Sequence, residues 1–185
     1  QQRVERLMSD YFRHARIVMR SLVWMRKTAP TPAGLNLGRT SDGIRFIDIR
    51  QAAVQPATWL AAFQAAIDDT CPVADSTLAV IRQHAERFRV EDFFPTPAHR
   101  TALLHFLRPA PGLYARLSEM HDCGLLGRMF PPFQAITYRV VRDFFHKYTV
   151  DEHTLLTIRN LERLGKSAAP DRLRFASLLQ DLQAP

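Results

Sequence analysis

The sequence predicts a mainly α-helical fold, a multi-helix bundle with one small β-hairpin or strand. Apolar residues recur at spacings of three and four over most of the 185 residues, which is the period of an amphipathic helix. Prolines and glycines interrupt this pattern at intervals typical of helix ends. Only the stretch 41–51 shows the alternation of apolar and polar residues that is expected of a strand, and the alternation there is incomplete.

The N-terminal part is expected to hold one long helix, a loop and the β element. Residues 4–26 carry an apolar stripe beside a polar surface rich in arginine. Pro30 and Pro32 end this helix, because proline lacks the backbone N–H and crowds the preceding turn. The turn-forming residues at 41–43, Ser-Asp-Gly, then lead into the β segment.

Further helices are expected wherever the same apolar spacing meets a proline, a glycine or a capping residue. They are expected to begin near Pro56, Asp75 or Ser76, Pro111, Phe133, Val150 and Pro170. Another is marked by Leu103, Leu104 and Leu107 and is ended by Pro109. Asp75 or Ser76 would cap its helix, and Pro111 would lie in a first turn. Gly124 would end the helix that starts at Pro111. Residues 133–148 are expected to form one continuous helix, and the next helix is expected to reach about Leu164.

Composition narrows the class of protein. The net charge is +7, but no run of five or six like charges occurs, so an arginine-rich surface is favoured over a nucleic-acid stripe. Cys71 and Cys123 lie far apart and predict two reduced thiols in a cytoplasmic protein. No apolar run is long enough for a membrane span, and the first ten residues show no signal-peptide pattern and no initiator Met. We therefore expect a piece of a longer protein that does not enter a membrane.

Three segments together resemble the bifunctional PII uridylyltransferase/uridylyl-removing enzyme family. They are LMSDYFRHAR at 7–16, LLHFLRPAPGLYARLSEMHDCGLLGRMFPPF at 103–133, and DFFHKYTVDEHTLLTIRNLERL at 143–164. The third is the strongest, because it is similar without gaps to the family hallmark ending in Tyr-Thr-Val-Asp-Glu-His-Thr. The resemblance implies a parent with a nucleotidyltransferase domain, a helical middle, an HD hydrolase domain and ligand-sensing ACT domains. Its partner would be the PII signalling protein.

The resemblance also implies a domain division. Residues 1–110 would form the helical interdomain region that follows an absent nucleotidyltransferase domain, and 111–185 would form part of the HD-type hydrolase domain. The Gly-Ser followed by Asp-x-Asp that holds Mg²⁺ against a nucleotide triphosphate does not occur in the sequence. We therefore do not expect the chain to transfer UMP alone.

By the resemblance, the HD centre would bind a divalent metal such as Mn²⁺ or Mg²⁺, which activates water for attack on a phosphoester. His153 would be its first ligand. The family's His-Asp pair would fall at Gln180 and Asp181, so that an amide replaces an imidazole and offers a poorer ligand. Arg142 stands where the family often has another histidine. We therefore predict a degenerate hydrolase centre and a catalytically silent fragment.

His146 is another candidate, because the family also has a histidine there. It would contact the substrate or support the metal ligands, or it would simply pack at a helix end. The remaining histidines show no ligand spacing and are expected at the surface or at helix caps; they are His14, His84, His99, His105 and His121. The acidic pair Asp151-Glu152 is accounted for by the helix dipole, which favours carboxylates in a first turn.

Two other functions stay open. The chain could be an RNA-binding helical module of a tRNA nucleotidyltransferase-like protein, which also joins a nucleotidyltransferase domain to helices. Nucleic acid is the less favoured partner, since no basic stripe is distinguishable from the core. The chain could also be a non-catalytic regulatory or interaction domain that holds a partner protein.

Overall fold

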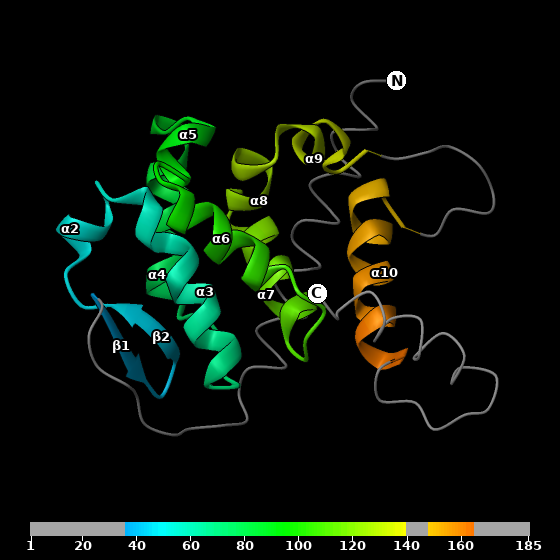
Figure 1. Ribbon diagram of the computed structural model, residues 1–185, viewed down its shortest axis with the longest axis horizontal. Coiled ribbons are helices and arrows are strands. Elements are labelled where there is room, and N and C mark those ends of the chain that lie inside the picture. Colours follow the sequence, from blue (N-terminus) through cyan, green and yellow to red (C-terminus); the bar gives the residue numbers. More distant parts are fainter. Residues whose placement is uncertain (1–35, 140–147, 165–185) are drawn as a thin grey trace.

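The structure, a computed structural model, describes residues 36–139 and 148–164. This part of the chain is mainly helical with one small antiparallel sheet, which confirms the predicted fold class (Figure 1). The helices expected over 4–26 and from Pro170 lie outside the described residues. None of the helices within the described ranges is long and apolar enough to cross a membrane.

The β element is a hairpin, one of the two predicted forms, but it begins earlier than the predicted stretch 41–51, and the end of that stretch is helical. Strands β1 (Leu37–Thr40) and β2 (Gly43–Phe46) pair antiparallel, with Leu37 opposite Phe46. Gly43 has φ +116°, and a Cβ there would lie 2.1 Å from the carbonyl oxygen of Pro72. The neighbouring Ile44 N–H donates to that same oxygen at 2.9 Å. Glycine is therefore required where the backbone between helices α3 (Trp59–Asp68) and α4 (Asp75–His84) approaches the hairpin.

The helices follow the hairpin in chain order. They are α2 (Ile49–Ala52), α3 (Trp59–Asp68), α4 (Asp75–His84), α5 (Val90–Phe93), α6 (Pro97–Phe106), α7 (Leu113–Asp122), α8 (Leu125–Met129), α9 (Pro131–Ile136) and α10 (Val150–Leu164), with 3-10 turns at Pro56–Thr58 and Ala85–Arg87. Figure 1 shows the hairpin at one side of the described body and α10 at the other, with α3, α6 and α7 between them.

Two predicted helix starts need correction. Asp75 is the first residue of α4, and the N-cap is Ala74, which makes no side-chain capping bond. Pro111 lies before α7, because Gly112 takes the N-cap position with φ +100°. Gly124 follows the end of α7 with φ +81°, so the predicted glycine stop is confirmed.

The core gathers large apolar side chains from the middle of the chain. Trp59, Phe63, Ile81, Met120 and Leu125 are fully buried. The indole N–H of Trp59 is satisfied by the carbonyl oxygen of Ala52 at 2.8 Å, as a buried polar atom requires. This arrangement places α7 inside the body, in contact with α3, α8 and α10.

Both cysteines are free thiols, as predicted from their spacing. Cys123 is buried after α7 and Cys71 is half-buried between α3 and α4. Burial raises the pKa of the Cys71 thiol, and Asp69 and Glu119 raise it further, while Arg39 and Arg116 oppose this.

The predicted continuous helix over 133–148 is wrong in its first part. Helix α9 ends at Ile136, Thr137 is extended, and Tyr138 adopts the left-handed conformation with φ +55°. The Thr137 hydroxyl donates to the carbonyl oxygen of Phe133 at 2.9 Å, a local bond of the kind that competes with helix continuation. Beyond it, the Val150 N–H donates to the carbonyl oxygen of Arg139 at 3.1 Å. Residues 140–147 lie outside the described part.

Candidate functional site

Helix α10 carries the predicted metal ligand His153. Its bounds, Val150–Leu164, confirm the helix predicted from the sequence, and Asp151 and Glu152 lie in its first turn. The backbone N–H of His153 donates to the carbonyl oxygen of Thr149 at 2.9 Å. The His153 side chain is exposed, so it is available to a ligand on the outer face of the helix.

The other predicted site residues belong to parts of the chain that the structure does not describe. Gln180, Asp181, His146 and Arg142 all lie outside the described residues. Within residues 36–139 and 148–164, no three His, Cys, Asp or Glu side chains gather where a cation could bind. Since a catalytic metal centre takes about three protein ligands, the described residues do not by themselves fit a metal.

A second histidine occupies a position that the sequence analysis did not expect. His121, predicted at the surface or a helix cap, is buried at the end of α7, and its Nε2 lies 2.7 Å from Oδ2 of Asp151. Their side chains are only 2% and 1% exposed. Phe133 meets the imidazole edge-on at 5.5 Å between ring centroids, and Tyr138 lies tilted against it at 5.2 Å. The pair therefore joins α7, the segment after α9, and the first turn of α10.

The surroundings of Asp151 keep its carboxylate ionised. Burial alone would raise the pKa of Asp151, but hydrogen bonds from His121, from the Thr149 side chain and from the Tyr138 backbone lower it to about 2. The predicted interaction with the helix dipole is therefore only part of the role of Asp151. Because both members are enclosed, the pair can fix the geometry of α10 but cannot touch a substrate.

A sequence signal for this pair exists in the helical spacing. Leu117 and Met120 belong to the buried stripe of α7, and position 121 follows Leu117 by four residues. In the same way, Asp151 precedes the buried Leu155 by four residues on α10. Positions at this spacing share a helix face, so both polar residues fall on core-facing positions. His99, which contacts the α6 cap Thr96, and His105, which is exposed, lie as expected.

Acid is expected to remove the stabilisation that Asp151 provides. The pKa of its carboxyl rises from about 2 in the folded chain to 3.8 when unfolded, so the stabilisation is complete only above about pH 5 and is lost progressively as the pH falls through about 2. The shift corresponds to about 2 kcal/mol of unfolding free energy. Urea unfolding of the natural chain and of Asp151→Asn between pH 7 and pH 2 measures it. The difference between the two should shrink by that amount, and a constant difference would contradict the expectation.

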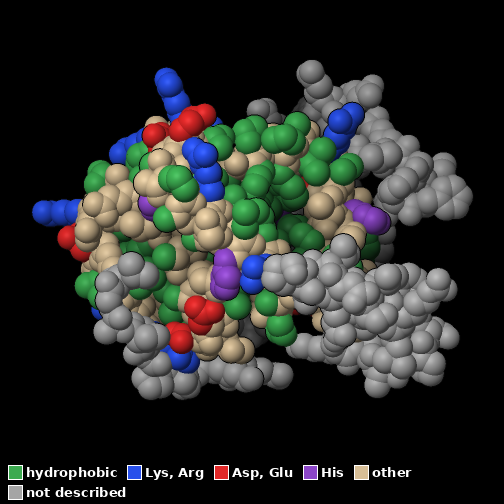
Figure 2. All heavy atoms as spheres, viewed as in Figure 1, with side chains coloured by type: hydrophobic (Ala, Val, Ile, Leu, Met, Phe, Trp, Pro, Cys, Tyr) green, Lys and Arg blue, Asp and Glu red, His purple; other side chains and the backbone are tan. Residues whose placement is uncertain are grey.

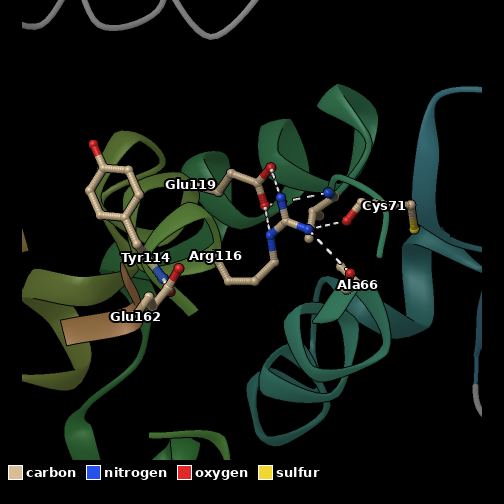
Figure 3. A network of polar contacts seen from close by, with 7 residues as sticks. Ala66, Cys71, Tyr114, Arg116, Glu119 and Glu162 are labelled. Atoms are coloured by element: carbon tan, nitrogen blue, oxygen red, sulfur yellow. Dashed lines mark hydrogen bonds and ion pairs between the residues drawn. The ribbon is translucent and has the colours of Figure 1, made fainter. Parts of the chain in front are cut away.

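A buried ion pair fixes the other side of α7 (Figure 3). The Arg116 Nε lies 2.8 Å from Oε2 of Glu119, and its Nη2 donates to Oε1 at 3.0 Å. The remaining guanidinium nitrogen, Nη1, donates to the backbone carbonyls of Ala66 and Cys71, and Glu119 accepts from the Val73 N–H at 3.4 Å. These bonds attach α7 to the α3–α4 connection, so the network is structural.

Comparison with known proteins finds relatives that share the name bifunctional uridylyltransferase/uridylyl-removing enzyme. Over 87 residues, 47% of the chain, it is 42% identical to the bifunctional uridylyltransferase/uridylyl-removing enzyme of Thiobacillus denitrificans. Over 115 residues, 61% of the chain, it is 34% identical to the enzyme of that name from Azotobacter vinelandii and 39% identical to that from Nitrosococcus oceani. No protein-family model and no solved structure matches the chain.

The matched part is a small share of these relatives. The chain spans 10% of the Thiobacillus protein and 13% of each of the other two. The resemblance predicted from the three sequence segments is nevertheless confirmed: about half of this chain or more is similar to bifunctional uridylyltransferase/uridylyl-removing enzymes.

Proposed function

We propose that this chain is part of a protein like the bifunctional uridylyltransferase/uridylyl-removing enzymes, covering the helical interdomain region (1–110) and the start of an HD-type hydrolase domain (111–185). The observation that carries the proposal is the similarity to these enzymes, at 34% identity over 115 residues for the Azotobacter relative. The exposed position of His153 on a helix attached to the core adds support.

In this proposal His153 is the first ligand of a divalent metal such as Mn²⁺ or Mg²⁺, and Asp181 is another. Such a metal supplies an activated water for phosphoester hydrolysis. Gln180 replaces an imidazole with a neutral amide, which is a weaker ligand for these ions. His146 lies close to His153 in sequence and would act beside the ligands or the substrate. The centre is therefore degenerate, and the chain is catalytically silent.

The proposed partner is a PII signalling protein in the cytoplasm. A protein partner suits the surface better than nucleic acid does. On the face drawn in Figure 2, basic side chains are scattered among acidic and hydrophobic ones, whereas nucleic-acid binding favours a clustered basic patch or stripe.

A UMP-release assay tests whether the proposed centre is catalytically inactive. The purified 185-residue chain, incubated with uridylylated PII and Mn²⁺, is expected to release no UMP. The Azotobacter vinelandii enzyme, under the same conditions, serves as the positive control. Measurable release by the chain that His153→Ala abolishes would show an active centre and overturn the proposed degeneracy.

A further inference from the structure

Helices α7 and α10 lie antiparallel and are joined by polar contacts at both ends. At one end, His121 closes α7 and meets Asp151 at the start of α10. At the other end, the Tyr114 N–H in the first turn of α7 donates to Glu162 of α10 (Figure 3). Arg159 adds a cation–π contact, with its guanidinium carbon 5.4 Å from the centroid of the Tyr114 ring. Contacts at both ends of the helix pair therefore fix the register between α7 and α10.

The two ends differ in what surrounds them. The contact at Tyr114 uses the helix backbone and is half-buried, so it caps α7. The His121–Asp151 contact is enclosed by Phe133 and Tyr138. Tyr138 holds a left-handed conformation with φ +55°, which costs a non-glycine residue free energy and persists only where the surroundings impose it. The strained residue, Tyr138, therefore packs on the His121–Asp151 contact at the N-terminal end of α10, which also carries His153.

Helix geometry connects Asp151 to His153. Each residue of an α-helix turns by about 100°, so positions two apart point to nearly opposite sides. With Asp151 held inward by His121, the side chain at 153 is directed outward, and it is indeed exposed. Any rotation or fraying of this first turn would move both side chains together.

We infer that His121 is a positioning residue: by holding Asp151, it fixes the first turn of α10 and thereby the direction of the His153 imidazole. The inference rests on the proposed function, because only there does His153 bind a ligand. It goes beyond that function by assigning a role to a histidine on another helix, 32 positions earlier in the chain, that never reaches the site itself. A role in packing alone would predict a loss of stability without a local effect at His153.

Paired substitutions at His121 separate the two roles. His121→Phe keeps an aromatic ring between Phe133 and Tyr138 but removes the donor to Asp151. His121→Gln keeps an N–H near the position of Nε2. Glu162→Leu is the matched control, because it breaks the contact at the far end of the same helix pair. Asp151→Asn provides a second route to the same comparison if His121→Phe does not fold.

The readout is NMR of the full chain without metal: the ring order parameter of His153 and amide hydrogen exchange in the first turn of α10. His121→Phe is expected to disorder the His153 ring and to speed that exchange about 10-fold, and His121→Gln should restore both. Glu162→Leu should loosen the first turn of α7 and leave His153 unchanged. A His121→Phe protein that melts earlier but keeps natural order at His153 would overturn the inference. Because neither metal nor UMP is measured, this outcome is independent of the release assay.

Discussion

Replacing Glu119 by leucine is expected to lower the free energy of unfolding by about 3–5 kcal/mol, the usual cost of removing one partner from a buried ion pair. Arg116 is 8% exposed and Glu119 is 3% exposed, so the guanidinium would stay in the core without its carboxylate. The Val73 N–H would lose its acceptor as well. Urea unfolding followed by helical circular dichroism measures the change.

The double variant Arg116→Met/Glu119→Leu is the control. Replacing both members of a buried pair with apolar groups is often close to neutral, so the double variant should recover a large part of the loss. It will not recover all of it, because Arg116 also donates to the carbonyl oxygens of Ala66 and Cys71. A single variant that costs less than about 1 kcal/mol would show that the pair behaves like an exposed one.

Replacing Gln180 by histidine is expected to raise the affinity of the chain for Co²⁺ on the order of 100-fold. Co²⁺ is a suitable probe, because its visible absorption reports on the ligands that hold it. In the proposed centre, the variant would present two imidazoles and the Asp181 carboxylate, and three protein ligands suffice for many catalytic metals. Calorimetric titration of both proteins at pH 7 gives the two affinities.

The fold was largely predictable where short-range signals decide it. The helix over 150–164 and the glycine stop at Gly124 were found from apolar spacing and from the freedom of glycine at positive φ. The break after α9 was missed. It depends on Tyr138, whose left-handed backbone is followed by Arg139 and whose ring lies against that of His121. A contact between residues distant in the chain cannot be read from local periodicity.

The residues of the candidate site depend on other signals than the fold does. His153 is proposed as a ligand through the resemblance alone, since nothing in the spacing of the histidines marks it. His121 follows Leu117 by four residues and so falls on the buried face of α7, which the spacing of the histidines alone does not reveal. The lesson is that a polar residue in the apolar stripe of a helix needs a partner, and here Asp151 is that partner.

In the proposed metal centre, His153 and Asp181 are ligands and Gln180 takes the place of a histidine. The most direct test is His153→Ala introduced into the Gln180→His variant, followed by Co²⁺ titration. If the claim holds, the affinity gained through Gln180→His is lost again, and the cobalt absorption loses the signature of that ligand set. If Co²⁺ binds the double variant as tightly as it binds Gln180→His, His153 is not a ligand of that metal and the proposed centre is wrong.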